Sequence, residues 1–119
     1  MKIAVSATAT TMESPMDPRF GRARYILFID SQSMKIEVMD NEKNVQSFKG
    51  AGIQVASAVA EKGAEVVLTG YCGPNAFRAL NAASIQVVQD VNGTVREAVE
   101  QFLQGELVVS EGPNTEGHW

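Results

Sequence analysis

The amino-acid sequence predicts an α/β fold in which helices cover a mixed β-sheet. Three observations predict it. Short apolar runs alternate, along the second half of the chain, with segments whose apolar residues recur at helical spacing. Two further β-rich runs precede them at hairpin spacing. The length of 119 residues, of which 45% are hydrophobic, suits one domain with one core and is too short for two.

The first half of the chain predicts three strands. Residues 2–6 form a short apolar run, and a long loop with Pro15 and Pro18 follows it. Residues 24–30 and 34–39 are β-rich runs separated by three residues, which suits a hairpin. In the second of these runs apolar residues alternate with charged ones. We therefore expect this strand to have one buried face and one solvent-exposed face, and to lie at the edge of the sheet.

From residue 53 the chain alternates between helices and strands. Apolar residues recur at helical spacing over residues 53–60 and again over 75–83. Each of these segments precedes a compact apolar run, at residues 65–69 and 85–88, that we expect to form a strand. The first strand of the chain then lies in the centre of the sheet, and the hairpin extends the sheet on one side.

The last helix has the clearest start and stop signals. Thr94 and Glu97 form a capping box, the apolar residues that follow occupy one helical face, and Gly105 stands where a carboxyl-terminal cap belongs. Residues 106–119 end in EGPNTEGHW, which is short of apolar residues. We therefore expect one domain over residues 1–105 and a flexible tail over 106–119.

Composition argues against several classes of function. The net charge of −4 argues against nucleic acid as a partner, and Arg19, Arg22 and Arg24 are too few to form a broad basic face. No apolar stretch approaches the roughly 20 residues of a membrane span, and the start of the chain lacks the apolar segment of a secretion signal. A single cysteine agrees with a reducing compartment, so we expect a cytoplasmic protein.

The stretch LTGYCGPNAFRAL is a candidate functional site, because ligands of open α/β sheets bind beyond the carboxyl ends of parallel strands. Gly73 permits close approach of the backbone, and Pro74 suits the first position of a helix. The amides of Asn75 and Ala76 then point outward and attract anions, and the same helix start lowers the pKa of a thiol such as that of Cys72. Alternatively, Cys72 is a small buried filler of a tight turn.

The stretch LTGYCGPNAFRALNAASIQVV, together with DPRFGRARYILFID upstream, resembles the dinitrogenase iron-molybdenum cofactor biosynthesis family, which includes NifX and the carboxyl-terminal domain of NifB. The likeness spans Met1 to about Leu103 and is carried by the paired motifs FGRA and TGxxGPNAF. It implies a ribonuclease H-like fold, with a five-stranded mixed sheet in the order 3-2-1-4-5, the second strand antiparallel and helices on both faces. It also implies a non-catalytic accessory role in metallocofactor biosynthesis.

The resemblance implies that the protein holds or delivers a labile iron–sulfur or iron–molybdenum cluster. Such a cluster is negatively charged and exposes sulfides, so a carrier holds it with cations, backbone N–H donors and one or two soft ligands. The implied partners are the cluster and a cofactor-assembly or acceptor protein, and the chain is a monomer or a homodimer that shares a cluster. The expected site consists of Cys72 as metal ligand and of Gly73, Asn75, Ala76, Arg19 and Arg22 as further contacts.

Other interpretations stay open at this stage. Arg19 and Arg22 alternatively form a solvated loop that pairs with Asp17 or Glu13, and the domain alternatively regulates or interacts by binding an anionic metabolite or a partner segment without metal. Enzymatic classes find little support. The first strand, KIAVSA, carries none of the carboxylates with which a nuclease holds two metal ions, and the single histidine, at position 118, lies in the tail.

Overall fold

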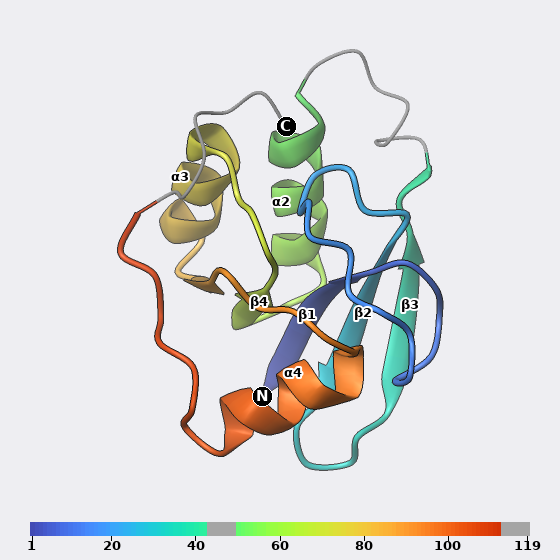
Figure 1. Ribbon diagram of the computed structural model, residues 1–119. Coiled ribbons are helices and arrows are strands. Elements are labelled where there is room, and N and C mark those ends of the chain that lie inside the picture. The colour runs from blue at the N-terminus through green and yellow to red at the C-terminus, as the bar shows by residue number, and fades with distance from the viewer. Residues whose placement is uncertain (43–49, 113–119) are drawn as a thin grey trace.

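The computed structural model describes residues 1–42 and 50–112 of the protein. Five strands form one mixed sheet in the order β3-β2-β1-β4-β5, and the described helices cover both of its faces (Figure 1). The predicted α/β class and strand order are confirmed. No helix within these ranges is long and apolar enough to cross a membrane. The elements are β1 (Lys2–Ala7), β2 (Tyr25–Asp30), β3 (Ile36–Asp40), α2 (Ala51–Glu61), β4 (Val66–Leu68), α3 (Pro74–Ala82), β5 (Gln86–Val88) and α4 (Val95–Leu103).

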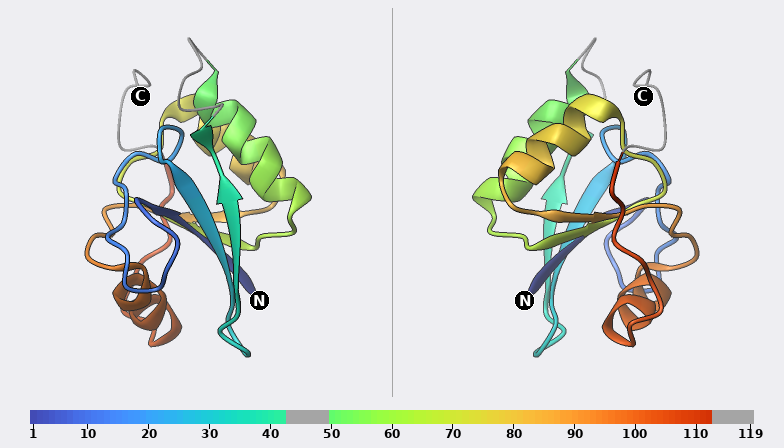
Figure 2. Two further views of the ribbon diagram at one scale, coloured as in Figure 1. Left: turned by 90° about the vertical axis from the view of Figure 1, so that its right-hand side faces the viewer. Right: turned by 90° about the vertical axis from the view of Figure 1, so that its left-hand side faces the viewer.

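The central strand β1 organises the sheet. It pairs antiparallel with β2 and parallel with β4, while β2 pairs antiparallel with β3 and β4 pairs parallel with β5. Because successive strand residues face opposite sides of a sheet, Ala4 joins one core cluster, whereas Ile3 and Val5 join the other. Helices α2 and α3 cover the first face, and α4 covers the second (Figure 2).

Strand β3 lies at the edge of the sheet, as predicted from its alternating residues. The prediction of one buried face is wrong at Val38, whose side chain is 43% exposed to solvent. Ile36, two residues earlier on the same side of the strand, does pack against the core. Helix α4, which covers this face of the sheet, packs mainly over the central strand β1 and not over the edge strand.

Helix α4 begins with the predicted capping box. Thr94 Oγ1 accepts a hydrogen bond from Glu97 N at 3.1 Å, and Glu97 Oε1 accepts one from Thr94 N at 2.9 Å. Val95, Ala98 and Val99 are buried against the sheet, as their spacing predicts. The reciprocal cap fixes the start of this helix and satisfies two amides that would otherwise lack partners.

The segment after α4 is better anchored than the sequence indicates. Leu107 packs against the core, and Ser110 N donates a hydrogen bond to the Val87 carbonyl at 2.7 Å. The first part of the segment that the sequence predicts to be a flexible tail, residues 106–119, therefore lies along the edge strand β5 and pairs with its backbone at Val87. Residues 113–119, with His118, lie outside the described residues.

Candidate functional site

The two sequence motifs meet beyond the carboxyl ends of the parallel strands. The Pro18 carbonyl accepts a hydrogen bond from Tyr71 N at 2.6 Å, and the Tyr71 carbonyl accepts one from Phe20 N at 3.1 Å. Behind these bonds, the buried hydroxyl of Ser6 in β1 lies 2.8 Å from Thr69 Oγ1. The loop after β1 and the turn after β4 are thereby held side by side.

Two glycines make this close approach possible. A Cβ atom on Gly70 would lie 2.8 Å from the Pro18 carbonyl oxygen. A Cβ atom on Gly21 would lie 2.8 Å from Cα of Gly52, in the first turn of α2. Neither distance leaves room for a side chain beside packed backbone. The loop after β1 therefore touches both the turn after β4 and the start of α2.

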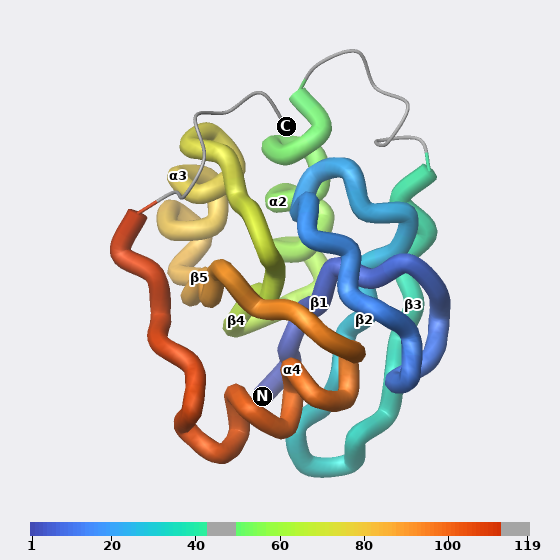
Figure 3. The backbone as a smooth tube through the Cα atoms, in the orientation of Figure 1, coloured from blue at the N-terminus to red at the C-terminus, as the bar shows by residue number. Residues whose placement is uncertain are grey.

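A pocket of about 80 Å³ opens where this loop meets the first turns of α2 and α3. The colours of the backbone tube show that these three segments are far apart along the chain (Figure 3). None of its described lining residues carries a charge, and several of them are glycine or alanine, so the backbone is open to a ligand. The walls are residues 20–21, residues 50–53, and Tyr71 with Gly73, Asn75 and Ala76.

Helices α2 and α3 run side by side in the same direction (Figure 1). The first turns of both helices line the pocket. Their first turns are in contact, since a Cβ atom on Gly52 would lie 3.0 Å from Ala76 Cβ. Intrahelical hydrogen bonds begin with Gln54 N in α2 and Phe77 N in α3, so the earlier amides have no partner within their helix. Within the described residues neither helix has a side-chain cap or an acidic residue in its first turn, whereas α4 has both.

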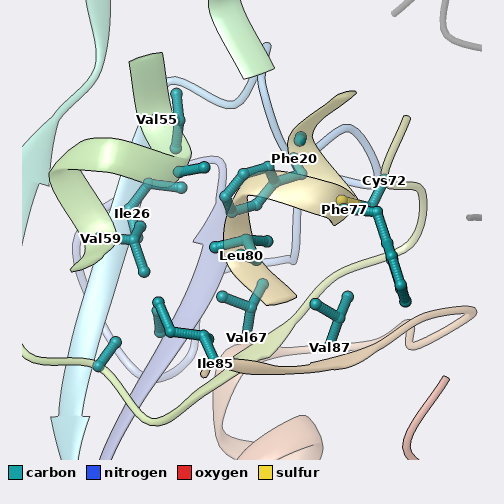
Figure 4. Packing of buried hydrophobic residues seen from close by; sticks show 14 of the residues in the cluster. Phe20, Ile26, Val55, Val59, Val67, Cys72, Phe77, Leu80, Ile85 and Val87 are labelled. Carbon is teal, nitrogen blue, oxygen red and sulfur yellow. The ribbon is translucent and has the colours of Figure 1, made fainter. Parts of the chain in front are cut away.

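Cys72 does not line the pocket. Its side chain is 1% exposed and belongs to the core cluster that also contains Phe20, Phe77 and Leu80 (Figure 4). Burial raises the pKa of the Cys72 thiol from an ordinary value of 9.0 to about 12, because a thiolate would lose its hydration there. The expected lowering of this pKa is wrong, since the side chain turns into the hydrocarbon interior. The interpretation of Cys72 as a buried filler agrees with this position.

Arg19 and Arg22 flank the pocket residues 20–21 in sequence, but neither is among the lining residues. Arg19 Nε lies 3.6 Å from Asp17 Oδ1, and the same oxygen accepts a hydrogen bond from Arg19 N at 3.0 Å. The pairing with Asp17, which was the alternative interpretation of Arg19, is therefore present. It partly neutralises this arginine beside the pocket.

The described residues at this edge of the sheet do not form a group of metal-ligating side chains. In the part of the chain that the structure describes, no three His, Cys, Asp or Glu side chains come together as a group that could hold a metal ion. Ser6 lies in β1 near the position where a nuclease would carry a carboxylate, and its hydroxyl donates a hydrogen bond to the Asp17 carbonyl at 2.7 Å. The pocket thus offers backbone donors rather than a cage of ligands.

Comparison with known proteins identifies a family to which the chain is similar. The model of the dinitrogenase iron-molybdenum cofactor family matches residues 1–105, which include every described strand and helix. The protein belongs to this family. The resemblance seen in the motifs FGRA and TGxxGPNAF is thereby confirmed.

Solved structures resemble this family member closely. The apo form of the orange protein from Desulfovibrio gigas is 46% identical, with a TM-score of 0.94 and 96% of each chain covered. A NifB-like protein from Thermotoga is 31% identical, with a TM-score of 0.83 and 98% of each chain covered. An uncharacterized protein of Methanocaldococcus jannaschii is 24% identical over 95 residues, which are 77% of this chain and 80% of that relative.

Of the site residues expected in this dinitrogenase iron-molybdenum cofactor family member, Gly73, Asn75 and Ala76 line the pocket. Residues 50–53 form a further wall of the pocket that was not predicted from the sequence. The sequence does contain a sign of this open helix start. Gly50 and Gly52 come just before the apolar residues at helical spacing, and no side chain suited to capping a helix stands there. What the sequence does not indicate is that this helix start packs beside the turn after β4.

Proposed function

We propose that the protein holds a labile, negatively charged metallocluster of the iron–sulfur or iron–molybdenum type in the pocket, without catalytic turnover. In this role it is a cytoplasmic accessory of metallocofactor biosynthesis that passes its cargo to an assembly or acceptor protein. The observation that carries the proposal is the meeting of two uncapped helix starts at one pocket.

The electrostatics of these helix starts favour an anion. Each helix start carries about half an elementary positive charge, and its first amides point at whatever lies in front of it. Two such ends in contact repel each other, and in the described residues no acidic side chain of either first turn offsets them. An anion seated between them accepts hydrogen bonds from both and removes the repulsion.

Membership of the family and the likeness to the NifB-like protein support a metallocluster as the anion. The close relative from Desulfovibrio gigas is known in an apo form. Because the Cys72 side chain is buried in the core and does not reach the pocket, the cluster is held by backbone amides and nearby cations, and not by a cysteine–metal bond. A ligand role for Cys72 would require the turn to open.

A second candidate function rests on the same burial of Cys72. No sulfur faces the pocket, so its described lining also suits an anionic metabolite or an acidic partner segment that contains no metal. Backbone amides bind oxyanions as well as sulfides, and the two candidates therefore differ only in what the pocket prefers.

Anaerobic titration with isolated iron–molybdenum cofactor, and separately with iron and sulfide, tests the proposal. We expect the wild type to retain cluster absorption after gel filtration and Asn75→Asp to lose it, because the new carboxylate places negative charge against the cluster. The same carboxylate in the first turn of α3 leaves the free energy of unfolding unchanged or raises it by about 0.3–1 kcal/mol. Loss of binding is then separable from loss of fold.

The matched control is Gln32→Glu, which makes the same charge change in the turn between β2 and β3, at the opposite end of the sheet. It should bind like the wild type. Equal binding by Asn75→Asp would contradict the proposal. Cys72→Ala should also retain the cluster, and tighter binding of sulfate than of cluster by the wild type would favour the metal-free function.

A further inference from the structure

Arg78 stands beside the pocket, one helical turn after Asn75. Its Nη2 donates a hydrogen bond to Asn75 Oδ1. Residues three apart on a helix lie on the same face, and Asn75 is itself part of the pocket wall. The exposed guanidinium of Arg78 is therefore one side chain away from the place where an anion would sit.

Arg78 differs from other arginines in the partner that holds it. Arg19, Arg24 and Arg96 each have a carboxylate oxygen within 3.7 Å. Arg78 has no such carboxylate among the described residues, and the side chain that holds it is a neutral amide. Within residues 1–42 and 50–112, its positive charge is consequently not neutralised by a nearby acid.

We propose that Arg78 recognises the anion in the pocket and that Asn75 holds its guanidinium ready at the mouth. This inference rests on the proposed function and adds the side chain that sets the preference for multiply charged anions. A guanidinium has five N–H donors in a planar fork, so some of them stay on Asn75 while others reach the ligand.

Arg78 adds a full positive charge that the two helix starts do not provide. Backbone amides and helix dipoles contribute partial charges to the pocket, whereas a guanidinium contributes a full charge and directional hydrogen bonds. Asn75 acts in two ways in this arrangement, as part of the wall and as the group that orders Arg78. Ordering the long side chain before binding reduces the entropy lost when the ligand arrives.

The experiment is an anaerobic titration of the full chain with isolated iron–molybdenum cofactor at several salt concentrations. For Arg78→Gln we expect the Kd to rise about tenfold, as for the loss of one charged hydrogen bond, and the salt dependence to become flatter. Arg78→Lys keeps the charge without the fork and should fall in between. Arg96→Gln removes the same charge from α4, across the sheet from the pocket, and should bind like the wild type.

A double-mutant cycle tests the role of Asn75. Asn75→Ala should weaken binding in the wild-type background and have a smaller effect when Arg78 is already glutamine, because the two side chains act as a unit. The thermal midpoints should match that of the wild type, since Arg78 is exposed. If the wild type binds and Arg78→Gln has the same affinity and salt dependence, the inference is overturned and the proposed function stands. If the wild type does not bind, both are overturned.

Discussion

At the Cys72 side chain two effects oppose each other. The start of α3 favours a thiolate, whereas burial among hydrocarbon side chains favours the neutral thiol. Burial decides the outcome, because the side chain is almost completely removed from water and its pKa rises to about 12. The thiol is therefore protonated and unreactive throughout the neutral pH range.

The raised pKa makes stability depend on alkaline pH. The thiol ionises near pH 9.0 when unfolded and near 12 when folded, so its contribution to stability is complete below pH 9 and is lost as pH rises toward 12. The slope is at most about 1.4 kcal/mol per pH unit. Urea unfolding at pH 8 and 10.5 should show the advantage of the wild type over Cys72→Ala shrinking by about 2 kcal/mol. A constant difference would contradict a buried neutral thiol.

Gly70 is the residue on which the contact between the two motifs depends most directly. Gly70→Ala would place a methyl group 2.8 Å from the Pro18 carbonyl oxygen, which is backbone and cannot rotate away. We expect a loss of about 1–3 kcal/mol in the free energy of unfolding, measured by urea denaturation. Gly112→Ala, which meets no atom within 4 Å, is the control and should be neutral.

At the scale of whole elements, the helices divide into two kinds. Helix α4 is capped at its start and covers one face of the sheet, whereas α2 and α3 begin uncapped at the pocket on the other face. Capping residues stabilise a helix by occupying the amides that a ligand would otherwise use. Of the described helices, the one with a reciprocal cap is therefore the one without a place in the proposed site.

The capping box of α4 should affect stability alone. Thr94→Ala removes the acceptor for Glu97 N and should lower the free energy of unfolding by about 1 kcal/mol, measured by chemical denaturation. The affinity for cluster should not change, because Thr94 does not line the pocket and caps the helix on the opposite face of the sheet. A parallel loss of affinity would show that α4 and the pocket are coupled.

Element types were predictable from the sequence because each depends on local information. Alternation and helical spacing located the strands and helices, and Thr94 with Glu97 located the start of α4. The contact between Gly21 and Gly52 was not predictable, because it depends on how an irregular loop returns across the sheet. The direction of the Cys72 side chain was unpredictable for the same reason, since backbone angles in a turn are set by distant packing.

At the scale of the whole molecule, exposed ion pairs and hydrogen bonds make the free energy of unfolding depend on pH in the acidic range. Hydrogen bonds and nearby cations hold the pKa of Glu13, Glu37 and Asp40 below their usual values, and backbone N–H groups of the turn after β2 do the same for Asp30. A lowered folded pKa gives stability that is present above the unfolded pKa and is lost as pH falls through the folded one.

The free energy of unfolding should therefore decline between about pH 5 and pH 2, measured by urea denaturation. Added salt should reduce the part of this decline that comes from the ion pairs, because exposed charges are screened. The part due to Asp30 should persist, since it comes from hydrogen bonds, and Asp30→Asn should remove it. A decline that salt abolishes completely would contradict this assignment.

The central place of β1 has a consequence during synthesis. β1 leaves the ribosome before its parallel neighbour β4, which includes residues 66–68, so one edge of β1 has no partner until that part of the chain has been made. Both faces of β1 are apolar, and an unpaired strand of this kind adheres to other nascent chains. Early pairing with β2 protects only one edge of β1. Until residue 68 has left the ribosome, the other edge stays open to aggregation, and chaperones are needed most during this interval.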